Sequence, residues 1–579
     1  MTGESLYDVI VVGAGHNGLV CANYLARAGL KVLVLEKRGI VGGAAATEEP
    51  FPGYKIDIGS AIHVLIHETP ILEDLQLERY GLEYLDLDPW AYAAFPDGTS
   101  LRFYKDLDRT CAEIARVAPR DAEAYRAFVT EWQRINAMFL PTFLTSPELP
   151  RLALRAATHN PLALAPMLSQ RVGEATTRRL LTSYGKLLAY TFDSEYVRAP
   201  LAFLSAHAGP NPYQLGTGNF AGWHALYHSR GVKRPRGGSG ALTEALRAAF
   251  EAQGGEVRTG VEVTLIDVEN GRTRGVATSD GAFIPARSVV SAIPVTTTLL
   301  GLVGPDHVGA ALRKRVRALS LGNGLGLYIR GAATDLPRYT ADPGDGPGDH
   351  HRGMHLLCPS IETLQRSYDE ATLGHPPRTP AVYALTPSVA DPSLAPAGRH
   401  TLYLWGQYYP YEVSDDRSWD DIRAAEADRL IDIAARYAPN MREILRERVI
   451  RTPLDMERDL SLPRGNYLHI DMSLDQLFFM RPAPRLSGYR TPLQGLYLTG
   501  ASMHPGGGIQ GASGLNAAKV VISDLHKTRR RMWAATATGV AAALAVGVAE
   551  VRRDGNRCTD EGSGTPRINP GACARHTSP

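Results

Sequence analysis

Three glycines and a glutamate near the start of the chain have the residue types and the spacing of a nucleotide-binding site. Gly13, Gly15 and Gly18 form a G-x-G-x-x-G pattern directly after the apolar run "VIVV". The first glycine permits a tight turn, the second lets the backbone approach a pyrophosphate, and the third lets a helix lie close to a sheet. Glu36 ends the next apolar run, where a carboxylate accepts hydrogen bonds from a ribose diol and repels a 2′-phosphate. The pattern therefore predicts FAD or NAD and disfavours NADP.

A second glycine-rich stretch lies far along the chain, in "GLYLTGASMHPGGGIQGASGLNAA" at 495–518. The run "GGG" leaves the backbone bare, and Gly511 and Gly514 precede residues with an apolar face at helical spacing. The N-terminus of a helix stabilises negative charge, which builds up on a flavin ring that accepts hydride. We expect this stretch to hold the redox-active ring; a mobile loop is the alternative, but the flanking strand and helix patterns disfavour it.

Ionisable side chains close to these stretches are candidates for proton transfer. His504 lies beside the glycine run and is the best-placed candidate for a catalytic role. Asp57, His63 and His67 follow the first nucleotide-binding segment, and we expect them to face the same cavity. The sequence singles out none of the four as a required base.

Three further histidines lie together in "PGDGPGDHHRGMH", at 350, 351 and 355. Their spacing is compatible with a metal ion, but glycine and proline on every side predict a mobile surface loop. The five cysteines are scattered without a C-x-x-C pattern. We therefore expect no metal.

A strand, a turn, a helix and a second strand must position the first set of residues. The run Val9–Val12 is typical of a strand that is buried on both faces. Gly29 is a suitable C-cap for the helix that follows, and a second strand is predicted over 31–35. The chain then reaches a second glycine pair, Gly42 and Gly43.

Two later segments are expected to return to this unit. "RPRGGSGALTEALRAAF" (234–250) predicts a helix that opens at Ala241, followed by strands around Val263 and over 288–293. The apolar alternation in "GLYLTG" predicts the last strand. The sequence therefore predicts an α/β nucleotide-binding domain that is assembled from discontinuous segments.

The segments "GAGHNGLV", "LEKRGIVGGAAATEE", "GNYLHIDMSLDQLFFMRP" and "LYLTGASMHPGGGIQGASGLNAA" together resemble the phytoene and carotenoid desaturase family of FAD-dependent oxidoreductases. The family includes relatives of carotene ketolase and pyridine nucleotide-disulfide oxidoreductase-like type. The resemblance implies a Rossmann-like FAD-binding domain with a discontinuous chain and an α+β substrate domain, as in amine oxidases and phytoene desaturases. It implies that FAD is held by Gly13, Ala14, Gly15, Gly18, Glu36, Lys37, Gly43, Ala44, Val263, Gly500, Ala501, Gly508 and Ile509.

Two positions depart from the pattern that the resemblance implies. Ala44 stands where many members of the family have an arginine, which removes a side-chain contact with phosphate. Gly500 and Ala501 stand where many flavoproteins end the last strand with an aspartate. Backbone N–H groups are expected to serve at this point instead.

The predicted FAD-binding domain comprises residues 1–105, 234–300 and 456–528, and the predicted substrate-binding domain comprises 106–233 and 301–455. The substrate domain combines helical runs with alternating segments such as "NGLGLYIRG" and "HTLYLWGQYYPYEV". A group of aromatic residues there is expected either to line a slot for a long apolar substrate or to pack in the core: Trp405, Tyr408, Tyr409 and Tyr411.

Composition and charge indicate which molecules the protein binds and in which compartment we expect it. Lys and Arg number 62 against 60 Asp and Glu, which argues against binding to nucleic acid. No secretory signal is seen, so a cytoplasmic location is expected. As a helix, the uncharged run 532–549 would span about 27 Å, just short of a hydrocarbon layer of about 30 Å. We expect 529–551 either to contact the inner face of the cell membrane or to form a solvent-exposed helix, and 552–579 to be disordered.

The resemblance to the desaturase family implies an FAD-dependent desaturase that introduces a C=C bond into a linear or monocyclic, hydroxylated carotenoid, for example at the 3,4 position. A carotenoid 4-ketolase and, in another class, a flavin-free lipid-binding chaperone are the alternatives. An amine oxidase would need an aromatic cage beside the flavin, which no sequence feature singles out. No second G-x-G-x-x-G follows a strand, so oxygen or a quinone is expected as the electron acceptor.

Overall fold

The computed structural model describes residues 6–148, 170–304, 306–344 and 346–528, together with 152, 154, 155 and 158. Two compact units are distinguished, Met1–Val520 and Val521–Pro579, and the fold and the site below belong to the first. The predicted membrane-contacting segment 529–551 and the predicted disordered tail 552–579 lie outside the described residues. Within the described ranges, no helix combines the length and the apolar character that crossing a membrane requires.

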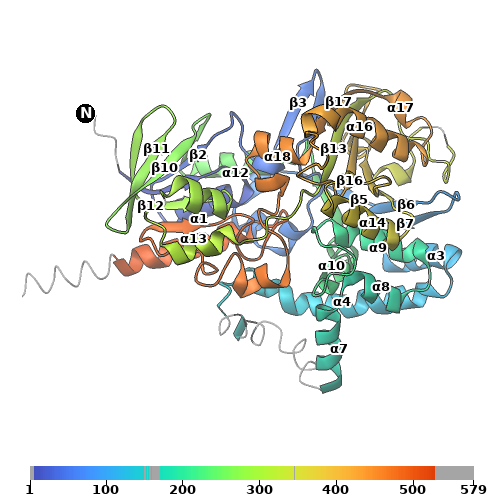
Figure 1. Ribbon diagram of the computed structural model, residues 1–579, viewed down its shortest axis with the longest axis horizontal. Helices are drawn as coiled ribbons and strands as arrows, with labels where there is room; N and C mark the ends of the chain where they lie inside the picture. The colour runs from blue at the N-terminus through green and yellow to red at the C-terminus, as the bar shows by residue number, and fades with distance from the viewer. Residues whose placement is uncertain are drawn as a thin grey trace, which may run out of the picture. The chain divides into compact units, whose positions relative to one another are not determined.

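The first seven-stranded sheet carries the nucleotide-binding pattern (Figure 1). Its strands are β1 (Tyr7–Val12), β2 (Val32–Glu36), β9 (Glu256–Thr259), β10 (Val263–Glu269), β11 (Arg272–Thr278), β12 (Phe283–Ser291) and β18 (Leu496–Leu498). β1 lies between β2 and β12 and runs parallel to both, and β18 pairs in parallel with β12. β10, β11 and β12 form an antiparallel extension. Segments from the start, the middle and the end of the chain thus build one sheet, which confirms the predicted discontinuous fold.

Helix α1 (His16–Arg27) lies against α12 (Gly240–Ala252) beside this sheet (Figure 1). Asn23 Nδ2 donates to the carbonyl oxygen of Leu246 at 2.8 Å and so joins the two helices. A Cβ atom at Gly18 would lie 2.1 Å from the carbonyl oxygen of Gly13. No side chain fits there, which confirms the predicted role of Gly18 in close packing.

The second seven-stranded sheet consists of β17 (Leu445–Arg451), β13 (Gly326–Ala333), β16 (His400–Gln407), β15 (Val382–Leu385), β14 (Met354–Leu357), β6 (Ala91–Ala94) and β7 (Ser100–Phe103), in that order. The two alternating segments predicted as strands are β13 and β16, which pair antiparallel over their full lengths. β6 and β7 belong to this sheet although they precede residue 105. The predicted domain boundary at 105 therefore falls too late in the chain.

The other α-helices of the described ranges lie in the segments that connect the strands. They are α2 (Ile71–Asp74), α3 (Leu107–Val117), α4 (Asp121–Phe143), α7 (Gln170–Leu181), α8 (Tyr184–Thr191), α9 (Glu195–Ala206), α10 (Gly218–Gly222), α11 (Ala225–Arg230), α13 (Ala310–Arg317), α14 (Ile361–Thr372), α15 (Pro387–Ala390), α16 (Trp419–Ala435), α17 (Met441–Ile444) and α18 (Pro453–Leu460). A further helix spans 512–528. Small antiparallel pairs are β3 (Thr47–Phe51) with β4 (Tyr54–Asp57), and β5 (Tyr84–Leu87) with β8 (Val232–Pro235).

The prediction of a mobile surface loop around the three neighbouring histidines is wrong. His350, His351 and His355 are 8%, 3% and 0% exposed. His355 belongs to β14, and its Nδ1 lies 2.6 Å from the hydroxyl of Tyr339. Across the described ranges, no group of three or more His, Cys, Asp or Glu side chains is placed to hold a metal ion.

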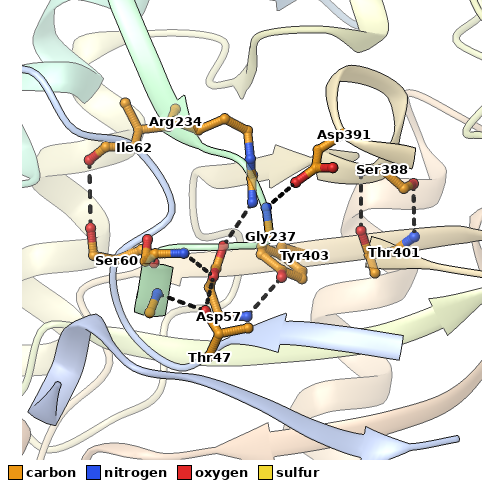
Figure 2. Close-up of polar contacts among 12 residues, drawn as sticks. Thr47, Asp57, Ser60, Ile62, Arg234, Gly237, Ser388, Asp391, Thr401 and Tyr403 are labelled. Carbon is orange, nitrogen blue, oxygen red and sulfur yellow. Dashed lines mark hydrogen bonds and ion pairs between the residues drawn. The ribbon is translucent and has the colours of Figure 1, made fainter. Parts of the chain in front are cut away.

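A buried carboxylate, Asp57, is the centre of a polar network that reaches the second sheet (Figure 2). Its Oδ1 accepts from the backbone N–H of Ser239, at the start of α12, at 2.7 Å. Its Oδ2 accepts from Arg234 Nη2 at 3.1 Å, with both side chains almost fully buried. The backbone N–H of Asp57 donates to the hydroxyl of Tyr403, on β16, at 2.8 Å. Asp57 thus links Tyr403 of the second sheet to β8 and to α12, the helix that packs against α1.

Replacing this carboxylate by an amide is expected to destabilise the fold strongly. In Asp57→Asn the guanidinium of Arg234 stays buried without a counter-charge, which costs about 3–5 kcal/mol. Urea unfolding followed by circular dichroism measures the loss. Glu83→Gln is the matched control, because Glu83 pairs with Arg236 at the surface. The urea concentration at the unfolding midpoint of this variant should equal that of the parent protein. Equal midpoints for the two variants would contradict a central role for Asp57.

Candidate cofactor-binding site

A cavity opens at the carboxyl ends of β1 and β2, where open α/β sheets bind their ligands. It encloses about 1180 Å³ that protein atoms do not occupy, part of which is open to solvent. Most of the predicted cofactor-binding residues line it: Gly13, Gly15, Gly18, Glu36, Lys37, Gly43, Ala44, Val263, Gly500 and Ala501. Residues that are distant in the sequence therefore meet at one wall.

The start of α1 presents free backbone N–H groups to this cavity. Gly15 is the N-cap, with φ −67° and ψ 166°, and no side chain caps the helix. A Cβ atom at Gly15 would have no protein atom within 4 Å, so the space above it belongs to the cavity. Open N–H groups beside unfilled space fit a pyrophosphate.

The carboxylate of Glu36 is fixed at the wall of the cavity. Its Oε2 accepts from the N–H of Ala14 at 2.8 Å, and its Oε1 accepts from the N–H of Arg38 at 3.0 Å. Each oxygen keeps a lone pair for a ribose hydroxyl. Arg38 also lines the cavity, and its Nη1 is buried without a hydrogen-bond partner in the described part of the chain. A polar ligand would satisfy this atom, so this end of the cavity fits the adenosine half of FAD.

The two glycine-rich stretches meet beside this cavity. The N–H of Gly514 lies 3.3 Å from Asn17 Oδ1, and Asn17 Nδ2 lies 3.0 Å from His16 Nε2. Burial lowers the pKa of His16 to about 4, although a hydrogen bond to the backbone of Gly508 opposes that shift. Gly508 therefore lies next to a residue of the cavity wall, His16, without lining the cavity itself.

Two further predicted cofactor residues do not line the cavity. Ala14 is fully buried; its N–H is bonded to Glu36, and its carbonyl accepts from the N–H of Gly42 at 2.9 Å. Ile509 is partly exposed and follows Gly508. Their contacts with the cofactor stay predictions.

The predicted catalytic histidine, His504, lies away from the cavity wall. It is fully buried, and its Nε2 is 3.1 Å from the carbonyl oxygen of Thr142. Burial lowers its pKa to about 4, so the ring is neutral near pH 7. Its catalytic role stays a prediction that its position does not favour.

The other ionisable candidates are also absent from the wall of the cavity. Asp57 is held in the polar network between the sheets. His63 uses both ring nitrogens inside the fold, at 2.9 Å from the hydroxyl of Tyr84 and 3.2 Å from Ser239 Oγ. His67 packs edge-on against Tyr84. The expectation that these three residues face the cofactor cavity is wrong.

The cavity has an apolar side formed by Ala44, Leu460, Leu462 and Tyr467. Trp405 lies behind it, with its ring stacked on Tyr328 at 5.5 Å between centroids and edge-on to Tyr467 at 6.2 Å. Of the four aromatic residues predicted to line a substrate slot or the core, Trp405 is the one in this cluster. Tyr408 lines a separate cavity, Tyr409 is in the core, and Tyr411 bonds to Glu457.

Sequence reasoning missed several residues of the cavity wall, among them His16, Tyr467 and His469. His16 lies inside the glycine pattern, where only the glycines and Ala14 were considered. Tyr467 and His469 lie in "GNYLHIDM", which has neither helical nor strand periodicity. The only signal for them was the resemblance of this segment to the desaturase family.

Comparisons with known proteins agree with this site. A family model described as "Flavin containing amine oxidoreductase" matches residues 18–330. The mouse protein "Pyridine nucleotide-disulfide oxidoreductase domain-containing protein 2" is 34% identical, over 90% of this chain and 94% of that protein. One of the subunits of limonene dehydrogenase from Castellaniella defragrans is 29% identical, over 90% and 95%. A phytoene desaturase (lycopene-forming) of Pseudescherichia vulneris is 28% identical, over 89% and 99%.

Solved structures share the fold. An oxidoreductase from Methanosarcina mazei has a TM-score of 0.56 and 18% identity, over 89% of this chain and 99% of that one. Cyclohexylamine oxidase from Brevibacterium oxydans has a TM-score of 0.56 and 16% identity, over 90% and 100%. At such identities the likeness concerns the fold alone.

Two glycines of the first motif are expected to respond differently to substitution. Gly15→Leu should keep the fold, because its side chain enters the cavity, but it should lose FAD. Gly18→Ala should lose both the fold and the bound FAD, because its Cβ would overlap the carbonyl of Gly13. Absorbance near 450 nm reports bound FAD, and thermal unfolding reports the fold.

Gly39→Leu is the control for Gly15→Leu. Gly39 is exposed, and a Cβ there would also meet no protein atom within 4 Å, but Gly39 does not line the cavity. This variant should retain FAD. Full retention of FAD by Gly15→Leu would contradict the assignment of the cavity.

The cavity thus fits FAD on two observations, the open space above Gly15 and the unpartnered Arg38 Nη1. The family match is to flavin-containing proteins, which disfavours the flavin-free chaperone alternative. The chain belongs to the flavin-containing amine oxidoreductase family and is an FAD-dependent oxidoreductase that is similar to phytoene desaturases.

Proposed function

We propose that this oxidoreductase is a desaturase that forms a C=C bond in an extended apolar polyene, a linear or monocyclic carotenoid. The observation that carries the proposal is the apolar side of the cavity. Leu460, Leu462 and Tyr467 line it, and Trp405 and Tyr328 pack behind them. Such a wall offers contact area to a hydrocarbon and excludes water.

The relatives support a hydrocarbon substrate. Limonene and phytoene, which two relatives carry in their names, are both isoprenoid hydrocarbons, and these relatives match almost the whole chain at 29% and 28% identity. The name of the mouse relative gives no substrate. The amine oxidase structures, at 16% identity, share the fold and carry no argument for an amine.

The reaction requires the side chains mainly to align the substrate. Bound FAD supplies the acceptor for the hydride that leaves one carbon of the substrate. A proton leaves the neighbouring carbon, so the substrate loses two hydrogens and gains a double bond. The polyene delocalises the positive charge that develops, so the apolar wall needs mainly to align the chain and keep water out.

We also propose that electrons pass to oxygen or a quinone, because the sequence holds one dinucleotide-binding pattern and FAD accounts for it. Contact of 529–551 with the inner face of the cell membrane stays a prediction.

Product analysis in a carotenoid-producing host tests the function. Expression of the chain should yield a carotenoid that is about 2 mass units lighter than its precursor, because desaturation removes two hydrogens. Mass spectrometry of the extracted pigments measures this change. Gain of a carbonyl would replace the desaturase by the 4-ketolase alternative, and an unchanged carotenoid profile from FAD-loaded protein would contradict both.

A charge placed on the apolar wall should separate substrate binding from cofactor binding. Leu460→Glu is expected to reduce product formation at least about tenfold, because a carboxylate next to a hydrocarbon is desolvated without a partner. FAD content should stay unchanged. Leu373→Glu is the control: Leu373 is 70% exposed and does not line the cavity, so it should leave both unchanged. Equal product from the two variants would contradict the assignment of this wall to the substrate.

A further inference from the structure

Gly500, which lines the cavity just after β18, has no room for a side chain. Gly500 has φ +91°, and a Cβ there would lie 2.7 Å from the carbonyl oxygen of Ala292. It would also lie 3.5 Å from Cε1 of His469. The ring of His469 therefore reaches the cavity wall beside Gly500, where the sequence has no acid.

The hydrogen bonds around Ser502 fit the tautomer of His469 that carries its hydrogen on Nε2. Ser502 Oγ accepts from the backbone N–H of Val295 at 3.0 Å and lies 3.1 Å from His469 Nδ1. In the tautomer with the hydrogen on Nε2, the Ser502 hydroxyl donates to Nδ1 while its Oγ accepts from Val295, so all three groups are paired. Burial lowers the pKa of His469 to about 3, so the ring is neutral. A neutral ring that accepts at Nδ1 carries its hydrogen on Nε2.

The backbone holds His469 in a costly conformation. Its φ is +66°, a region that a residue with a side chain rarely adopts. The buried guanidinium of Arg481 fixes this conformation, because its Nη2 donates to the carbonyls of Leu468 and Ile470, on either side of His469, at 2.9 and 3.3 Å. Strain that the surroundings fix in this way is a feature of ligand sites.

We propose that His469 is a cofactor-positioning residue whose Nε2–H donates a hydrogen bond to an oxygen atom of FAD. Ser502 is the residue that fixes the tautomer for this bond. The proposal extends the set of FAD-binding residues to a side-chain donor at a point where the sequence predicts backbone N–H groups alone. It rests on FAD binding and not on the identity of the substrate.

A second group in the same chain has the same bonding pattern away from the cavity and provides a matched control. Ser388 Oγ accepts from the backbone N–H of Thr401 at 3.0 Å, as Figure 2 shows. It lies 3.2 Å from Nδ1 of His400. None of these three residues lines the cofactor cavity.

The experiment measures the dissociation constant of FAD by titrating apoprotein, together with thermal unfolding of the apoprotein. His469→Leu removes the donor and should weaken FAD binding about tenfold to hundredfold, the range for a hydrogen bond to a charged or polar oxygen. His469→Gln keeps an N–H near Nε2 and should restore binding to within about threefold of the parent protein. Ser502→Ala should give an intermediate loss. His400→Leu should bind FAD like the parent protein.

Three results would overturn the proposal. The first is FAD binding by His469→Leu that is as tight as in the parent protein. The second is FAD binding by His469→Gln that is no tighter than that of His469→Leu. The third is a loss of FAD binding by His400→Leu that equals the loss by His469→Leu. Should His469→Leu fail to fold, the comparison of His469→Gln with Ser502→Ala decides, because only the second loses the fixed tautomer. Loss of FAD binding is measured without substrate, so failure of the desaturase proposal leaves this test intact.

Discussion

The fold depends on a close approach of two helix N-termini that only glycine permits. At Gly514 a Cβ would lie 2.2 Å from the carbonyl oxygen of Asn17, in the first turn of α1. At Gly18 it would meet the carbonyl of Gly13. Because both helices begin at this point, their free N–H groups converge on one region. The segment at 495–520 is therefore tied to the first strand–helix unit, although most of the chain separates them.

A second constraint ties the second sheet to α12. The carboxylate of Asp57 bonds to the start of α12 and to Arg234, while its backbone N–H bonds to Tyr403 on the second sheet. A buried ion pair contributes little net stability but tolerates few alternative arrangements. Trp405, which packs behind the apolar wall, lies on the same strand as Tyr403, so the sheet that supports this wall is tied to α12 through Asp57.

The nucleotide-binding half of the site was predictable because its chemistry acts through the backbone. Glycine spacing and the position of Glu36 encode a turn, a helix start and a strand end, all of which are local. The burial of His350 and His351 was not predictable, because it depends on packing against the rings of Tyr92 and Tyr339, which lie in other segments of the chain. His469 was missed for a similar reason: its position depends on a bond from Arg481 and on a left-handed backbone that no periodicity signals.

The different surroundings of the glycines also bear on how this family diverges. Gly18 and Gly514 face protein atoms, whereas Gly15 faces the cavity. In a descendant without redox chemistry, selection for glycine would be relaxed at position 15. Packing would still require glycine at positions 18 and 514. The pattern of glycine retention across related genomes therefore distinguishes lineages that have lost the flavin from those that have lost the architecture.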